Sequence, residues 1–223
     1  VSAFLCNVFR QAIVALCDKL VAAKKLSKDM SRKAVHIAAG CLLLFWPLFS
    51  TEHWTWRLNI LVPALYIPIL LMKGLGGAAA DDPDVRAMTR SGDPKELLRG
   101  PLYFATVAVA IGLFLFRQDA GYLVMAPLTF GDGIAPLVGA AFPRCGRYRT
   151  FGRPKTAAGS AAVFVFGMLG SAAFQAAGWL SAALDWPVVT AAMLLATVVE
   201  ALSPSDLDNI FIPTAVLFVL WVA

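Results

Sequence analysis

Apolar stretches nearly as long as a bilayer is thick alternate with shorter polar segments along this chain of 223 residues. A helix needs roughly 20 apolar residues to cross the hydrocarbon core of a membrane. Eight segments approach that length: residues 3–22, 34–50, 57–73, 101–117, 121–142, 160–178, 184–201 and 210–223. The pattern is weakest in the first segment, which carries Arg10 and Gln11, and the last segment is short.

These segments predict helices, because lipid offers no hydrogen-bond partner to the backbone and a helix satisfies its own. We therefore expect an all-α, polytopic transmembrane bundle of about 7–9 helices. A single membrane-embedded domain over residues 1–223 is the expected organisation. The composition agrees, with 59% hydrophobic residues and a mean hydropathy of +0.73, whereas soluble domains are about 45–50% apolar.

Positive charge is distributed unevenly between the predicted loops. All of the 19 Lys and Arg except Arg10, Arg57 and Arg117 fall in loops or helix ends that alternation places on one side. The main basic loops are 24–33, 73–100 and 143–155, and the opposite loops are 51–56, 117–120 and 179–187. The positive-inside rule accounts for this asymmetry, so the net charge of +5 does not indicate nucleic acid. We expect the basic loops to face the cytoplasm or, in a plastid, the stroma.

The longest polar segment, 74–100, contains two predicted helix starts. Asp-Pro pairs at 82–83 and 93–94 are typical of an N-cap followed by the first helical residue, and Glu96 completes the second pattern. The short helix through Leu97–Leu98 is expected near the membrane interface. The segment is interpreted either as a surface connector or as a lid or platform over a lipid-facing entrance.

Asp132 interrupts an apolar run, and a carboxylate at membrane depth is costly unless it faces a polar cavity or a partner. On a helix, Asp132 shares a face with Ala135, Pro136 and Gly139. The small residues of this region also suit close helix packing, which explains the glycines but not the acid. We therefore predict that Asp132 is functional, as a ligand of Mg²⁺.

The densest basic run leads into the sixth apolar segment and comprises Arg144, Arg147, Arg149, Arg153 and Lys155. Contact with anionic lipid headgroups is one interpretation of the run. Lys155 differs from the arginines because it precedes Gly159 and Ser160 at a predicted helix start. Backbone N–H groups and the helix dipole there favour phosphate binding beside a lysine.

Two further clusters are candidates for site chemistry. Arg32 and His36 lie four residues apart on one helix face, beside Lys33, and His36 is either structural or functional. Glu200 and the pair Asp208-Asn209 lie between the last two apolar segments, on the otherwise basic side. They are interpreted as a solvated turn or as groups that bind a metal ion or accept a proton.

Several motifs resemble the phytol and farnesol kinase family, particularly its plastid members. They cover residues 31–212 and occur in the expected order: Ser-Arg-Lys-Ala-Val-His-Ile at 31–37, Arg-Ser-Gly-Asp-Pro-Lys-Glu-Leu-Leu-Arg-Gly-Pro-Leu-Tyr at 90–103, Gly-Asp-Gly at 131–133 with Gly139, Lys-Thr-Ala-Ala-Gly-Ser at 155–160, and Val-Glu-Ala-Leu at 199–202 with Asp-Asn at 208–209. Dolichol kinases and phosphatidate cytidylyltransferases share a looser form. Ala135-Pro136 departs from the family, which often has a charged or polar residue there.

The resemblance implies a membrane kinase that transfers the γ-phosphoryl group of CTP, or of UTP or ATP, to a prenyl alcohol. In plants, such a reaction salvages phytol for tocopherol synthesis. The implied cofactor is Mg²⁺, and the implied membrane is that of the chloroplast, with an ER-type membrane as the alternative. Phosphoryl transfer requires positioning and charge neutralisation.

The roles expected from the resemblance divide the candidates into three groups. The implied metal ligands are Asp132, Asp208, Asn209 and Glu200. Nucleotide contacts are implied for Lys155, Arg153, Arg32, Lys33, Gly139, Gly159 and Ser160. The general base would be Asp208 or His36.

Two other functions remain open on the sequence. A cytidylyltransferase acting on a lipid phosphate would share the nucleotide and release pyrophosphate. A transporter would use Asp132 and His36 as an ion path, although its charges should lie nearer mid-membrane and its halves often repeat. The sequence does not specify the alcohol, the nucleotide or the oligomeric state.

Overall fold

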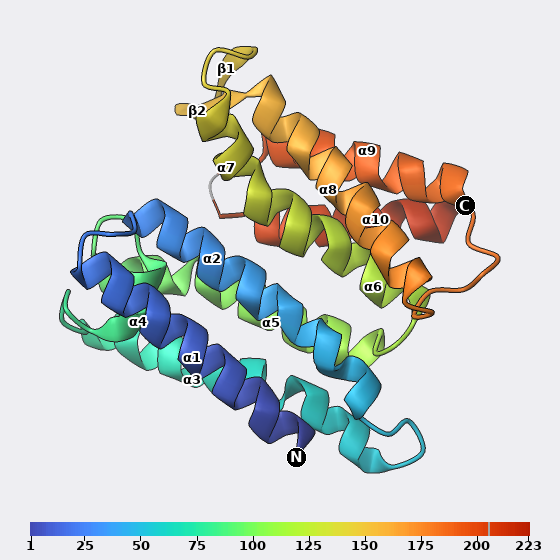
Figure 1. Cartoon of the computed structure of the whole chain (residues 1–223), viewed down its shortest axis with the longest axis horizontal. Helices are drawn as coiled ribbons and strands as arrows, with labels where there is room; N and C mark the ends of the chain where they lie inside the picture. Colours follow the sequence, from blue (N-terminus) through green and yellow to red (C-terminus); the bar gives the residue numbers. More distant parts are fainter. Residues whose placement is uncertain (205) are drawn as a thin grey trace. The chain divides into compact units, whose positions relative to one another are not determined.

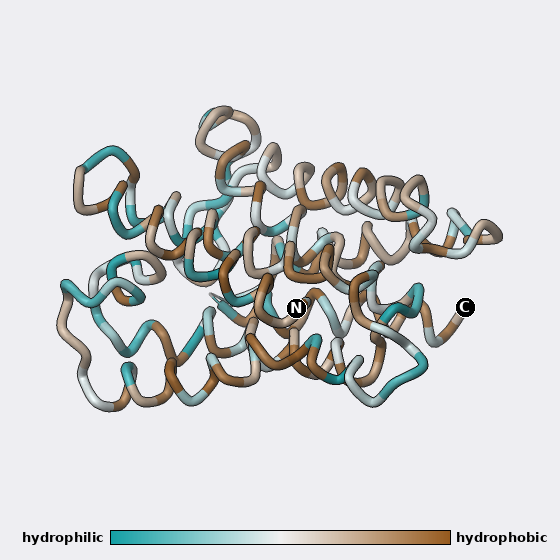
Figure 2. Tube along the Cα trace, turned by 60° about the horizontal axis from the view of Figure 1, so that its bottom comes forward, coloured by the Kyte–Doolittle hydropathy of each residue, from teal (hydrophilic) through white to brown (hydrophobic). Residues whose placement is uncertain are grey.

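The computed structural model describes residues 1–204 and 206–223, which are mostly helical. Contacts divide the chain into two compact units, Val1–Phe114 and Leu115–Ala223 (Figure 1). Each unit is described by itself. Along the trace, apolar residues follow the helices, while hydrophilic residues gather mainly at turns (Figure 2).

The first unit is built from helices that begin and end where the sequence supplies suitable caps. In chain order these are α1 (Ser2–Ala22), α2 (Lys28–Gly40), the 3₁₀ segments η1 (Cys41–Leu48) and η2 (Trp54–Ile60), α3 (Leu61–Gly76), α4 (Pro83–Met88), the 3₁₀ turn η3 (Pro94–Leu98) and α5 (Gly100–Phe114). The side chain of Ser27 accepts the Met30 N–H, so α2 starts earlier than the apolar pattern predicts. Gly77 ends α3 with a left-handed φ of 67°.

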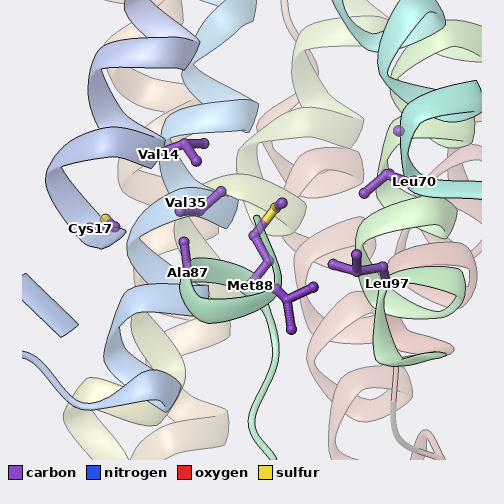
Figure 3. Packing of buried hydrophobic residues seen from close by; sticks show 9 residues of the cluster. Val14, Cys17, Val35, Leu70, Ala87, Met88 and Leu97 are labelled. Carbon is purple, nitrogen blue, oxygen red and sulfur yellow. The ribbon is translucent and has the colours of Figure 1, made fainter. Parts of the chain in front are cut away.

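The hydrophobic core of the first unit lies where α4 and η3 are enclosed by longer helices (Figure 3). Its side chains come from six elements: Val14 and Cys17 of α1, Val35 of α2, Leu70 of α3, Val85, Ala87 and Met88 of α4, Leu97 of η3, and Ala105 of α5. Leu70, Ala87 and Leu97 are fully buried. Much of the polar segment 77–99 is therefore part of a packed core, because its apolar residues are enclosed by the long helices.

Both helix starts predicted in the polar segment are confirmed. The Asp82 carboxylate accepts the N–H groups of Asp84 and Val85, and the Asp93 carboxylate accepts that of Lys95. Glu96 differs from the predicted capping pattern. Its carboxylate accepts the backbone N–H groups of Arg90 and Ser91, so it fixes the loop that leads into η3.

The second unit centres on an interrupted helix that a hairpin connects to its neighbour. The elements are α6 (Asp119–Ala126), the π-turn η4 (Pro127–Gly131), α7 (Asp132–Ala141), β1 (Arg147–Thr150), β2 (Arg153–Thr156), α8 (Ala157–Ala176), α9 (Trp186–Leu202) and α10 (Asp208–Val222). Helix α8 packs against α7, η4 and α9, and α10 packs against α9 and α6 (Figure 1).

The prediction of a helical membrane bundle is confirmed, since each of the eight apolar segments falls on a helical stretch. Within the described residues, four stretches are long and apolar enough to cross a bilayer: Trp54–Gly76, Pro94–Phe114, Asp119–Ala141 and Ala157–Ala176. The apolar helices α9 and α10 are shorter. That the remaining helices also cross the membrane stays a prediction.

Two local features were not predicted. The π-turn η4 interrupts the fifth apolar segment directly before Asp132, and the antiparallel hairpin β1–β2 replaces an expected loop. The segment predicted as 34–50 is also not one regular helix, because it continues as 3₁₀ helix from Cys41 and includes Pro47. Proline lacks the N–H that a regular α-helix requires.

Candidate functional site

Asp132 is held inside the second unit at the start of α7. It is 3% exposed and directly follows the π-turn η4, which packs against α6, α8 and α10. A π-turn shifts the helical register by one residue and often occurs at functional sites. The structure therefore confirms that the one carboxylate of this apolar stretch points into the protein, where its charge requires polar partners.

The glycines near Asp132 allow α7 and η4 to approach α8 closely. A Cβ atom on Gly131 would lie 2.8 Å from the carbonyl oxygen of Val163, and one on Gly139 would lie 3.8 Å from the Cα atom of Gly159. One on Gly159 would lie 3.1 Å from the carbonyl oxygen of Ala135. Gly139 and Gly159 therefore serve close helix packing. The nucleotide contacts that the resemblance implies for them stay a prediction.

The N-terminus of α8 has its own cap. Thr156 Oγ1 accepts the Gly159 N–H at 3.0 Å, which explains why α8 begins at Ala157. The Ser160 hydroxyl lies 2.5 Å from the Tyr148 hydroxyl. Two of the groups predicted to contact phosphate, the Gly159 N–H and the Ser160 hydroxyl, are thus engaged within the protein.

The hairpin sorts the basic residues onto two faces. Tyr148 pairs with Lys155 across the strands, and Arg149 pairs with Pro154. Paired side chains share a face and alternate along each strand, so Arg153 lies on the face of Lys155, whereas Arg147 and Arg149 lie on the other. Periodicity alone could not show this, because the sequence predicted no strand here.

Lys155 and Glu200 are brought together although they lie far apart in the sequence. The Lys155 ammonium donates to Glu200 Oε1 at 2.8 Å and to the Glu200 carbonyl oxygen. Their side chains are 18% and 10% exposed. An ion pair this enclosed loses much of its hydration, so removal of either partner would leave a poorly solvated charge.

The start of α10 carries the other acidic candidates. Asp208 occupies its first turn, where the helix dipole favours a carboxylate. Asn209 is 3% exposed, and its amide group donates to the Asp208 carboxylate at 3.1 Å and to the Asp206 carbonyl oxygen. Within the described part of the chain, the Asn209 Oδ1 atom accepts no hydrogen bond. Ser205 lies outside the described residues.

The predicted metal ligands do not converge as a group of carboxylates. Over residues 1–204 and 206–223, no three His, Cys, Asp or Glu residues are close enough together to hold a metal ion. Mg²⁺ commonly uses one or two protein carboxylates, together with water and substrate phosphates. The buried Asp132 carboxylate and the Asn209 Oδ1 atom, which accepts no hydrogen bond from the described residues, are therefore oxygens of the kind that can bind Mg²⁺.

The remaining candidates belong to the first unit. Arg32, Lys33 and His36 lie on α2, and Lys33 is only 6% exposed. The His36 ring lies 4.6 Å from the Phe104 ring, between centroids, in a tilted arrangement. This contact supports a structural role for His36, the alternative that the sequence left open.

Thr129 was not predicted as a site residue. It lies in η4 and is 0% exposed, and among the described residues its hydroxyl has no hydrogen-bond partner. Other helical hydroxyls bond to the carbonyl four residues earlier, as Thr190 and Thr197 do. The π-turn changes this geometry at Thr129. The sequence signal that could have indicated Thr129 is a hydroxyl within an apolar run, three residues before Asp132.

Comparison with known proteins gives a consistent family. No family model and no solved structure matches the chain. "Probable phytol kinase 1, chloroplastic" of Glycine max is 35% identical over 93% of this chain and 71% of its own length. "Probable phytol kinase, chloroplastic" of Zea mays is 34% identical over 93% of this chain and 71% of its own length.

A third relative, "Phytol kinase 1, chloroplastic" of Arabidopsis thaliana, is 30% identical over 95% of this chain and 72% of its own length. These alignments cover nearly the whole chain, so both described units fall within the similarity. The resemblance noted in the sequence motifs is confirmed. The chain belongs to the phytol kinase family.

Proposed function

We propose that this protein is a prenyl alcohol kinase that transfers the γ-phosphoryl group of CTP to phytol, farnesol or geranylgeraniol. The observation that carries the proposal is the similarity to phytol kinases over nearly the full chain. UTP and ATP are the alternative donors. The names of the relatives also support a chloroplast membrane. The uneven distribution of Lys and Arg between the loops supports placing the basic loops in the stroma.

Lys155 is the proposed contact to the nucleotide phosphates. Its ammonium is pre-positioned by the hairpin and by Glu200 rather than disordered in solvent. Arg153 shares its hairpin face and would add a second positive charge. Phosphate bound to Lys155 would weaken the ion pair between Lys155 and Glu200. The Glu200 carboxylate would then require another positive charge nearby.

Asp132 and Asn209 are the proposed protein ligands of Mg²⁺, supported by Asp208 and Glu200. The buried carboxylate of Asp132 supplies negative charge, and the Oδ1 atom of Asn209, which accepts no hydrogen bond from the described residues, supplies a further oxygen of the kind that Mg²⁺ prefers. When bound, Mg²⁺ would neutralise charge on the phosphoryl oxygens.

The acceptor alcohol would enter from the bilayer with its isoprenoid tail between helices. Asp208 is the proposed base for the hydroxyl proton, because its carboxylate lies at the start of α10 beside Asn209. His36, whose ring lies in tilted contact with that of Phe104, is the alternative base. A hydroxyl proton needs an acceptor as the new P–O bond forms.

A product assay tests the reaction. Purified protein would be incubated with each of four nucleotides and with phytol, farnesol, geranylgeraniol or phosphatidate. The expected products are a prenyl monophosphate and CDP. Pyrophosphate and a CDP-lipid from phosphatidate would instead show a cytidylyltransferase, and no turnover of any pair would contradict both reactions.

A further inference from the structure

The tip of the β1–β2 hairpin exposes an aromatic side chain on a strained backbone. Phe151 is 71% exposed and has a φ of 47°, and Gly152 follows with a φ of 77°. A two-residue turn of this kind suits Asn-Gly or Gly-Gly, because residues with a Cβ atom disfavour positive φ. The phenyl ring contributes nothing to a core here, so its presence needs a reason outside the folded unit.

Arginines lie on the outward face of the same hairpin and just before its first strand. Arg147 and Arg149 lie on the face opposite Lys155, and Arg144 precedes the first strand. All three are exposed. The sequence from 133 to 184 contains no Asp or Glu, so the hairpin and the helices next to it in sequence contribute only positive charge to this surface.

Two of these arginines each form one local hydrogen bond, and their other N–H groups can still bind phosphate. Arg147 donates from Nε to the Pro143 carbonyl oxygen, and Arg149 donates from Nη2 to the Gly152 carbonyl oxygen at 3.3 Å. A guanidinium carries five N–H groups, so one local bond orients the side chain without preventing phosphate contact.

The neighbouring helices place the hairpin at the membrane surface. It connects the stretches Asp119–Ala141 and Ala157–Ala176, both long and apolar enough to cross a bilayer. Strands of four residues extend only about 13 Å. The hairpin therefore stays close to the headgroups, where Phe142, 59% exposed at the end of α7, adds apolar surface.

We propose that the outward face of the hairpin lies on an anionic bilayer, with Phe151 inserted below the headgroups and Arg144, Arg147 and Arg149 bound to lipid phosphates. Basic residues beside an aromatic anchor are typical of protein segments that bind anionic bilayers. The opposite face keeps Tyr148 and Lys155 against the bundle. The membrane would thus hold the hairpin that positions Lys155.

Spin-label depth measurements test the insertion directly. Phe151→Cys would be labelled with a nitroxide in a Cys41→Ser, Cys145→Ser background and placed in nanodiscs of neutral or one-third anionic lipid. In anionic discs, the label should be accessible to oxygen and shielded from a water-soluble nickel complex. A label at Glu52→Cys, in an exposed loop, is the aqueous control. Equal nickel accessibility at both positions in both lipids would overturn the proposal.

A second arm uses the exposed native Cys145, labelled in a Cys41→Ser background. Phe151→Asn suits the left-handed backbone and lacks the ring, so it should raise the melting temperature while making the Cys145 label severalfold more accessible to nickel. An unchanged accessibility would contradict the anchoring role of Phe151.

The same assay distinguishes the contribution of the arginines from that of Lys155. It also distinguishes lipid phosphate from free phosphate as the bound group. Arg147→Gln with Arg149→Gln should abolish the difference between neutral and anionic discs, whereas Lys155→Gln should preserve it. Free inorganic phosphate in neutral discs should not reproduce the anionic shift; if it does, the face binds soluble phosphate instead. Label depth is independent of turnover, so its result stands apart from that of the product assay.

Discussion

At the residue scale, Lys155 has two candidate partners: the Glu200 carboxylate that it contacts and the nucleotide phosphates proposed above. Lys155→Gln should lower kcat/KM for the nucleotide about 10- to 100-fold, the cost of one hydrogen bond to a charged group. KM for the alcohol should change little. Lys155→Arg should restore activity only in part, because a planar fork does not replace a compact ammonium.

The controls for Lys155 come from the same hairpin. Arg147→Gln and Arg149→Gln change residues of the opposite face, so nucleotide kinetics in neutral detergent should stay near those of the unmodified protein. Equal and mild effects for all variants would mean that Lys155 serves only as part of an electrostatic anchor.

Asp132→Asn should abolish activity while the protein stays folded and inserted. The amide keeps the shape of the carboxylate but loses the charge proposed to hold Mg²⁺, which should cost several kcal/mol of transition-state stabilisation, by order of magnitude. Thermal unfolding with and without Mg²⁺ supplies a second measurement. Substantial turnover by a folded variant would remove Asp132 from the site.

Thr129→Val should stabilise the protein, because valine has the same shape and removes a buried hydroxyl that lacks a partner within the described residues. A gain of about 1 kcal/mol follows from the desolvation that is no longer required. Thr129→Ser retains the hydroxyl and loses a methyl group, so it should be less stable. Melting temperatures in one detergent would compare the three, and a destabilised Thr129→Val would show that the hydroxyl has a partner.

At the scale of elements, the short helix α4 depends on its acidic cap. Asp82 caps α4 and forms an ion pair with Lys73 at 2.8 Å. Burial raises the pKa of Asp82, but the Lys73 ammonium and the N–H groups of Asp84 and Val85 outweigh it, and the pKa lies below the ordinary 3.8. The charged carboxylate therefore stabilises the fold above its unfolded pKa, and this contribution is lost as pH falls through the lower folded pKa.

Asp82→Asn isolates this charge, since asparagine is an equally good N-cap. The variant should melt at a lower temperature than the unmodified protein at pH 7. Below the folded pKa, where Asp82 is protonated, the two should converge. A difference that is independent of pH would show that the cap geometry, not the charge, stabilises α4.

At the scale of the whole molecule, the proposed site requires a common side for the basic loops. Loops 24–33, 74–100 and 143–158 should be labelled from one side of the membrane, and loops 51–56, 117–120 and 179–187 from the other. Single cysteines reacted with an impermeant reagent in sealed vesicles measure this. Labelling of 74–100 and 143–158 from opposite sides would contradict the alternation of loops that the charge pattern predicts.

The sequence by itself determined the helical membrane class, the apolar segments and the caps at Asp82 and Asp93. These depend on local chemistry: lipid requires internally bonded backbone, and an Asp side chain binds the N–H groups next to it. The motif order also indicated the family, because chemistry constrains several separated segments at once. Asp132 was recognisable because a charge in an apolar run is costly without a partner.

Only the tertiary structure decided which distant residues contact each other and where the fold departs from the local sequence patterns. It paired Lys155 with Glu200, brought Gly139 and Gly159 into close helix packing, and, over the described residues, gathered no three His, Cys, Asp or Glu side chains into a metal site. These outcomes depend on the distances between helices, which no periodicity encodes. The hairpin register likewise separated Lys155 from Arg147 and Arg149, because a strand alternates its faces at each residue.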